Sequence, residues 1–177
     1  MTLEYVVSAV AKLTRRYRTR DPFELCAALG IELWFDDLGQ NLKAFYVYES
    51  RERNIAVNNR CSEELQRVLV GHELCHDQEH RSLIKMKGFT EIDLFNLTSP
   101  LEYEANLYAA ELLLDDERLL ELMEDEVSFF AITQQMKVPP ELLDLKYRLL
   151  KHKGYRIQPL YLGQANFLAR ETLSLGV

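Results

Sequence analysis

Residues 62–80 decide the fold and read SEELQRVLVGHELCHDQEH. Ser62 followed by two glutamates is typical of a helix start, because the hydroxyl caps free backbone N–H groups and the acids suit the positive end of the helix dipole. Leucine and valine then recur at helical spacing up to His72. This stretch therefore predicts one helix over about residues 62–80.

Inside this helix lies the motif His-Glu-x-x-His, formed by His72, Glu73 and His76. Residues four apart project from the same face of a helix, so two neutral imidazoles one turn apart can bind one Zn²⁺ ion. Glu73 lies beside them, where a carboxylate can take a proton from a metal-bound water. We therefore predict metal ligands at His72 and His76 and a catalytic acid/base at Glu73.

The same helix contains an inverted motif, HxxEH, over residues 76–80. Apolar residues before His72 place the first motif in the buried half of the helix, whereas the second sits among polar residues such as Asp77 that we expect to be solvated. A catalytic metal needs a partly dry cavity, which favours the first motif. His80 lies about 6 Å beyond His76 along the axis. It is therefore expected at the surface or as a hydrogen-bond partner of a ligand.

A catalytic zinc site needs a third protein ligand, and the helix predicted over about residues 100–114 offers Glu102 and Glu104. Asn106 follows Glu102 by four residues, so it faces the same way and could hydrogen-bond to a ligand. Ser99 and Glu102 also fit a capping box, in which the glutamate would serve its own helix end. From these residues alone, Glu102 and Glu104 both remain possible third ligands.

The composition of the whole chain is that of a globular protein. Its 177 residues are 47% hydrophobic, with only seven glycines and five prolines, which excludes a disordered or collagen-like chain. A net charge of −7 disfavours nonspecific nucleic-acid binding, which depends on Lys and Arg. Three cysteines without a CxxC pair, no secretion signal and no apolar run of roughly 18 residues predict a cytoplasmic protein without a membrane span.

The remaining patterns predict a mainly helical α+β fold with a small antiparallel sheet. Strands are predicted at residues 31–35 and in a hairpin over 45–57, and a connecting loop at 81–98. Further helices are predicted at about residues 3–18, 22–29, 116–125, 128–135 and 140–152. The last two helices flank a turn that contains two prolines, so this pair predicts a helix-turn-helix-like unit.

Two further blocks accompany the motif, and together the three resemble the ImmA/IrrE family of zinc metallo-endopeptidases. One block is residues 37–40 followed by the hairpin up to residues 55–58. The other is residues 102–113, EYEANLYAAELL, which is similar to the family segment E-x-x-A-N-x-F-A-A-x-L-L. The similarity covers roughly residues 20–150.

This resemblance implies a zincin-like metallopeptidase domain over residues 1–126, followed by a helical helix-turn-helix-like region over 127–177 that packs on it. It also implies a substrate class, because members of the family act in bacteria or on mobile elements and cut helix-turn-helix repressors. By position, it implies zinc ligands and a catalytic acid/base at His72, His76, Glu102 and Glu73.

An extended substrate is expected to add a strand beside the hairpin, because main-chain pairing holds a peptide without demanding one sequence. The residues expected to bind it are Ile55, Ala56, Val57 and Asn58. An oxyanion donor is also expected. Its candidates by chemistry are Tyr46, Tyr48 and Tyr103.

Two other function classes compete with the peptidase. The first is a regulator that binds DNA through residues 128–152. The charge of +3 over 138–177 is weak for this role, and −9 over 101–126 repels phosphate, so we expect no direct nucleic-acid binding. The second is a structural zinc protein closed by Cys75 or His80 as a fourth ligand, although such a site does not require the acid in the motif.

Overall fold

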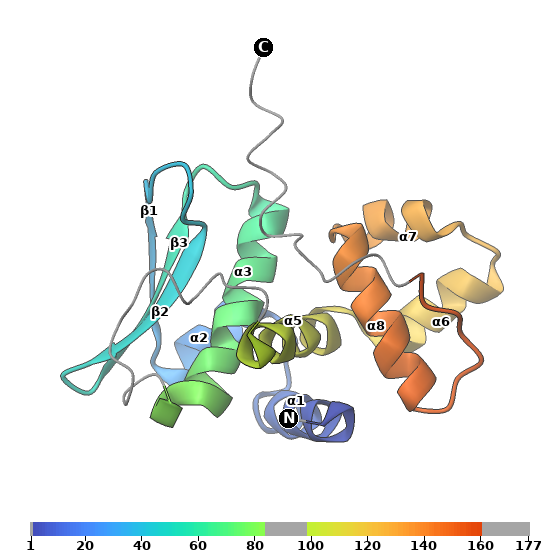
Figure 1. The fold of residues 1–177 in the computed structure, drawn as a ribbon, viewed down its shortest axis with the longest axis horizontal. Helices are drawn as coiled ribbons and strands as arrows, with labels where there is room; N and C mark the ends of the chain where they lie inside the picture. Colours follow the sequence, from blue (N-terminus) through green and yellow to red (C-terminus); the bar gives the residue numbers. More distant parts are fainter. Residues whose placement is uncertain (1, 84–98, 161–177) are drawn as a thin grey trace, which may run out of the picture.

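The computed structural model describes residues 2–83 and 99–160, and it places a three-stranded sheet beside a set of helices (Figure 1). The first described part contains α1 (Leu3–Tyr17), α2 (Pro22–Leu29), β1 (Glu32–Asp36), β2 (Ala44–Glu49), β3 (Glu52–Asn58), α3 (Glu63–Cys75) and the π-helix η1 (His76–His80). The second contains α5 (Pro100–Leu113), α6 (Asp116–Glu124), α7 (Phe129–Met136) and α8 (Pro140–His152). The predicted α+β class is confirmed. Most of the loop predicted at 81–98 lies outside the described residues.

Local capping signals start the two helices that carry the motifs. The hydroxyl of Ser62 accepts a hydrogen bond from the backbone N–H of Leu65 at the start of α3. Ser99 does the same for Leu101 at the start of α5, where Pro100 supplies a φ angle that already suits a helix. Both helices therefore begin where the sequence predicts them.

The sheet has the strand order β1-β3-β2 and is mixed. The predicted hairpin is antiparallel, with Tyr46 opposite Ile55, but β1 runs parallel to β3, with Leu33 opposite Ile55. The prediction of an antiparallel sheet is therefore wrong for β1. The reason is the path of the chain, because it passes from β1 to the far edge of the sheet as β2 and returns between the two as β3.

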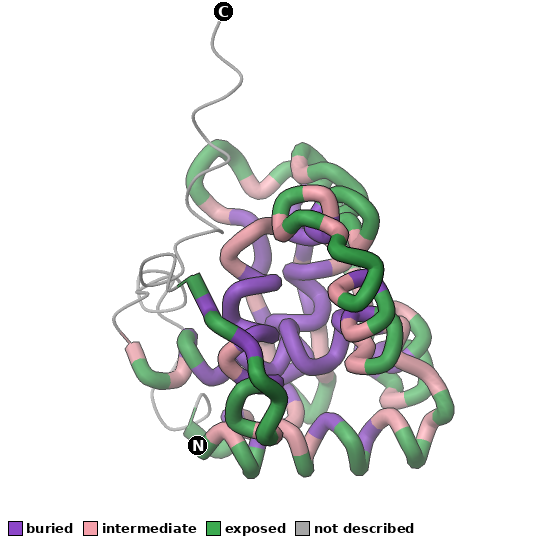
Figure 2. Tube along the Cα trace, turned by 90° about the vertical axis from the view of Figure 1, so that its right-hand side faces the viewer, coloured by how far each residue is buried: buried purple, intermediate pink, exposed green. Residues whose placement is uncertain are grey.

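Helix α5 lies at the centre of the helical part and packs against α3, α1 and α8. Every residue from Glu104 to Leu113 is buried, and Ala105 and Ala109 are fully so, which lets the neighbouring helices approach closely. Figure 2 shows the buried residues gathered in the middle of the molecule, with exposed residues along the outside. The polar side chains of α5 are therefore held in a dry, packed environment.

The last helices lie on the far side of α5 from the sheet (Figure 1). Helix α8 packs on α5, on α1 and on α7, and most of its residues are buried. Where the chain is described, no helix has both the length and the apolar character needed to cross a membrane. The boundary predicted near residue 126 stays a prediction.

Candidate metal centre

Three buried side chains from neighbouring helices converge on one point. They are His72 of α3, His76 at the start of η1 and Glu102 of α5, each at most 3% exposed. Glu102 Oε2 lies 3.0 Å from His72 Nε2, and Glu102 Oε1 lies 3.5 Å from His76 Nε2. The two Nε2 atoms are 3.3 Å apart. The donor atoms of the predicted ligands thus face one another.

These separations fit a shared divalent cation. Ligand atoms at about 2.0–2.2 Å from a tetrahedral Zn²⁺ ion lie roughly 3.3 Å from each other. The three measured separations, 3.0, 3.3 and 3.5 Å, surround that value. Two imidazole nitrogens and one carboxylate are also donors that Zn²⁺ accepts. The cluster is therefore compatible with metal binding.

The carboxylate of Glu102 is held in its ionised form. Burial by itself would raise its pKa, but hydrogen bonds and charge interactions with His72 and His76 outweigh burial and lower the pKa to about 2. The expected capping box is not what directs this side chain, since Ser99 caps Leu101 while Glu102 faces the two histidines. The carboxylate is thus available as an anionic donor at neutral pH.

Glu104, the other candidate ligand, lies outside this cluster. Its Oε2 atom accepts a hydrogen bond from His80 Nε2 at 3.1 Å. The structure therefore separates the two glutamates that the sequence left open. Glu102 faces the motif histidines, and Glu104 faces the histidine one turn beyond them.

Glu73 lies beside the cluster and is 1% exposed. Burial raises its pKa, while His76, His72 and a hydrogen bond from the backbone N–H of Tyr46 act in the opposite direction. Its Oε2 atom has no hydrogen-bond partner within the described residues. A buried carboxylate oxygen left without a donor is unusual and fits a group that serves a bound species.

Each motif histidine has a second buried contact through its other ring nitrogen. His72 Nδ1 lies 2.9 Å from Asn106 Oδ1, which is the contact expected of Asn106. His76 Nδ1 lies 3.0 Å from His80 Nδ1. His80 is 2% exposed, so of its two expected positions the surface one is wrong, and the contact with His76 is the one expected of a ligand's hydrogen-bond partner. The helix changes from α to π at His76, and the ring of His80 lies next to that of His76, with the ring centres 5.1 Å apart and the planes tilted by 55°.

The prediction that the polar second half of the helix over residues 62–80 is solvated is wrong for Asp77. Its side chain is fully buried, because the hairpin covers this face of the helix and supplies partners for the charge. Tyr46 donates its hydroxyl proton to Asp77 at 2.8 Å, and Arg81 and Arg53 lie 2.9 and 3.4 Å away. The sequence did not predict this buried aspartate with its tyrosine and arginine partners, because runs of Asp, Gln, Glu and Arg are normally exposed.

The tyrosines expected as oxyanion candidates differ in their surroundings. Tyr46 is fully buried, and its hydroxyl is engaged by Asp77. The ring of Tyr48 lies under Arg81, with the guanidinium carbon 5.5 Å from the ring centre. Tyr103 is 39% exposed and hydrogen-bonds to Arg148 of α8. An oxyanion role for Tyr46 is therefore disfavoured.

The expected substrate strand at Ile55, Ala56, Val57 and Asn58 is wrong. These residues form the central strand β3, which pairs with β1 on one side and β2 on the other. A strand alternates its N–H and C=O groups between its two sides, so a strand paired on both sides has no groups left for a peptide. The strand whose backbone reaches the cluster is β2, through Tyr46 and Glu73.

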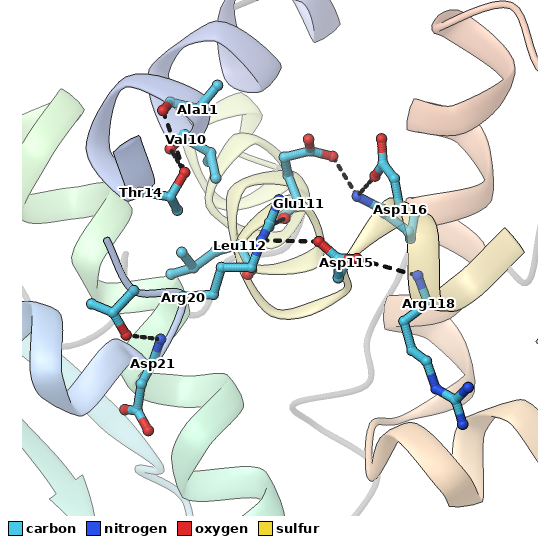
Figure 3. A network of polar contacts seen from close by, with 12 residues as sticks. Val10, Ala11, Thr14, Arg20, Asp21, Glu111, Leu112, Asp115, Asp116 and Arg118 are labelled. Atoms are coloured by element: carbon cyan, nitrogen blue, oxygen red, sulfur yellow. Dashed lines mark hydrogen bonds and ion pairs between the residues drawn. The ribbon is translucent and has the colours of Figure 1, made fainter. Parts of the chain in front are cut away.

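A second group of charges, which the sequence did not predict, lies at the other end of α5; Glu111 and Lys146 are buried, and Asp116 and Lys153 are partly exposed. Lys146 of α8 lies 2.7 Å from Glu111 and 2.5 Å from Asp116, and Lys153 lies 2.6 Å from both carboxylates. Arg20 reaches backbone carbonyls at the same helix end. Figure 3 shows Glu111, Asp116 and Arg20 around this point.

The chain is similar to a phage protein and to a family of peptidases. The chain is 29% identical over 145 residues to a protein of Bacillus phage phi105 described as "Uncharacterized immunity region protein 2". The match covers 80% of this chain and 88% of that protein. A family model of peptidases, described as the IrrE N-terminal-like domain, matches residues 26–148. The resemblance seen in the sequence is thus confirmed, and the chain belongs to the IrrE N-terminal-like family of peptidases.

Proposed function

We propose that this chain is a zinc-dependent endopeptidase that cleaves a protein substrate. One observation carries the proposal, namely the convergence of His72, His76 and Glu102 on one point with the buried carboxylate of Glu73 beside it. Membership in a peptidase family supports the same reaction class. Zn²⁺, when bound there, supplies a Lewis acid for the scissile carbonyl and a nucleophilic water near neutral pH.

Proton transfer and the positioning of the proton carrier are carried out by residues of this chain. Glu73 accepts the proton of the attacking water and delivers it to the leaving amine, as a general base and then a general acid. The backbone N–H of Tyr46 holds this carboxylate in place, while its Oε2 atom, which has no hydrogen-bond partner within the described residues, remains able to take the proton. The dry surroundings of α3 and α5 strengthen the electrostatic interactions that stabilise the transition state.

We place the substrate backbone on the outer edge of β2. This edge adjoins the cluster, because Tyr46 of β2 contacts Glu73 through its backbone. Within the described part of the chain, the sheet ends at β2. An extended peptide added there would pair through its main chain and bring its carbonyl group to the metal centre.

A helix-turn-helix transcriptional repressor is the proposed substrate, cleaved to relieve repression. The resemblance to the ImmA/IrrE family implies this class, and the phage relative is described as an immunity region protein. Of the acids in residues 101–126, five on and after α6 are exposed, which favours a basic partner such as a DNA-binding protein; they are Glu117, Glu121, Glu124, Asp125 and Glu126.

The number of ligands favours a catalytic site over a structural one. The cluster has three ligand side chains in the described residues, and neither Cys75 nor His80 joins it. A structural zinc site needs four protein ligands. Direct DNA binding is not favoured either, because α8 buries most of its residues against the rest of the molecule, including Lys146.

The test is cleavage of a helix-turn-helix repressor encoded next to this gene. The purified chain is loaded with Zn²⁺ and incubated with the repressor, and the products are identified by mass spectrometry. We expect one or a few defined cuts, which disappear with a chelator and with Glu73→Gln. Wild-type protein that binds no zinc, or cleavage that survives Glu73→Gln at the original rate, would overturn the proposal.

A further inference from the structure

His80 connects the metal centre to Glu104 through its two ring nitrogens. Its Nδ1 atom lies 3.0 Å from His76 Nδ1, and its Nε2 atom lies 3.1 Å from Glu104 Oε2. His80 and Glu104 are 2% and 9% exposed. The contacts span η1 and α5, so they depend on the packing of the two helices as well as on local helix geometry.

This arrangement is a bridge between two residues and does not form a second metal site. Residues that share an ion point one donor atom each at a common position. His80 instead uses opposite sides of its ring for His76 and Glu104. In the described residues, the only group of converging donors is His72, His76 and Glu102.

The hydrogen bonds can have only one direction when His76 Nε2 binds a metal. His76 then carries its proton on Nδ1 and donates it to Nδ1 of His80. His80 must accept there, so its own proton sits on Nε2 and is donated to the carboxylate of Glu104. Both donated protons therefore have an acceptor, at His80 Nδ1 and at Glu104 Oε2.

We propose that His80 and Glu104 are positioning residues that hold His76 in the ring orientation and tautomer needed for metal binding. The proposal rests on the proposed metal site. The other ligand histidine has a simpler support, because His72 Nδ1 is held directly by the amide oxygen of Asn106. The π-turn at His76–His80 supplies the extra width that lets the second histidine lie between the ligand and the carboxylate.

The test measures zinc affinity in the full chain by competition with a chromophoric chelator. We expect Glu104→Ala and His80→Ala each to weaken zinc binding about 10- to 100-fold, which is the usual effect of removing a partner that orients a ligand. Glu104→Gln keeps an oxygen that accepts from His80 Nε2, so its affinity is expected within about 3-fold of wild type.

Two measurements separate positioning from general destabilisation. The matched control is Glu79→Gln in the same π-turn, because Glu79 is hydrogen-bonded to Tyr5 and not to the histidines. This variant should bind zinc like wild type. Thermal unfolding of each metal-free variant reports stability independently. The visible spectrum of the Co²⁺-loaded protein reports ligand geometry and should change for Glu104→Ala but not for Glu104→Gln.

Failure of the positioning role and failure of the proposed function give different results. If wild type binds zinc tightly and both alanine variants bind it equally well, the positioning role is refuted while the proposed function stands. If His80→Ala abolishes zinc binding and His72→Ala retains it, the metal uses the inverted motif, and this proposal is wrong. If wild type itself binds no zinc, the proposed function fails first.

Discussion

Charged side chains cluster at both ends of α5, but the two groups are built differently. At the C-terminal end, Glu111 and Asp116 face Lys146 and Lys153 at 2.5–2.7 Å, so two carboxylates meet two ammonium groups. At the N-terminal end, the carboxylate of Glu102 meets His72 and His76 at a common point, Glu104 meets His80, and no cationic side chain joins Glu102 and the two ligand histidines within the described residues.

The comparison teaches how to distinguish a structural cluster from a binding site. The lysine cluster supplies its own cations and joins α5, α6 and α8. In the histidine cluster, donor atoms approach to 3.0–3.5 Å, and Glu73 Oε2 has no partner within the described residues. Burying a charge is costly unless it is compensated, so the second arrangement is suited to a bound cation.

The largest expected effect is at Glu73. Glu73→Gln should reduce kcat/KM for repressor cleavage by about 10³-fold, because the amide cannot accept the water proton. Zinc affinity should remain within a few-fold of wild type. Cleavage kinetics and metal analysis of the same sample check both statements. If zinc were lost together with activity, Glu73 would belong to the ligand set.

A comparable effect on stability is expected at the other end of α5. Lys146→Met should lower the free energy of unfolding by about 3 kcal/mol, because it leaves the buried Glu111 and the partly exposed Asp116 with one cation fewer. Urea unfolding measures the change. Lys137→Met is the matched control, since Lys137 is 71% exposed in its side chain and pairs only loosely with Glu64. Unchanged stability of Lys146→Met would show that the lysine cluster is not structural.

Zinc itself should stabilise the folded chain through the histidine cluster. At a free concentration 100 times the Kd, the expected gain is about 2.7 kcal/mol, seen as a rise in Tm that a chelator reverses. His72→Ala should lose most of this shift, whereas Lys146→Met should keep it from a lower starting Tm. A shift of the same size in His72→Ala would place the metal elsewhere.

The smallest effect concerns pH. Burial alone would raise the pKa of Asp116, but hydrogen bonds from Lys146 and Lys153 outweigh it, so the folded-state pKa lies below its usual value. The stability contributed is therefore present above the unfolded value of about 3.9 and is lost as pH falls through the lower folded value. Urea unfolding at pH 7, 5, 4 and 3 should show a shallower acid loss for Asp116→Asn than for wild type.

Much of the site was predictable because its signals are local. The spacing of His72 and His76 places both rings on one helix face whatever the rest of the fold does. The caps at Ser62 and Ser99 set the starts of α3 and α5 in the same local way. The downstream block around Glu102 was identified through the family resemblance, and the family itself is now confirmed.

The errors concern residues whose environment depends on distant segments. Asp77 was expected to be solvated, but the hairpin covers it, and of the two positions expected for His80 the packing excludes the surface one. A substrate strand was expected beside residues 55–58, but this segment returns between β1 and β2 and pairs with both. Polar composition reports average exposure, and it cannot report which other element packs against a given face.

The sequence alone determined the histidine pair, the neighbouring acid, the helix starts and the family, because each depends on residues a few positions apart or on one continuous pattern. The tertiary structure decided that Glu102 and not Glu104 faces the pair, that His80 links His76 to Glu104, and that β2 adjoins the cluster. These outcomes depend on how α5 and the hairpin pack against α3, and helical periodicity cannot specify the relative rotation of two packed elements.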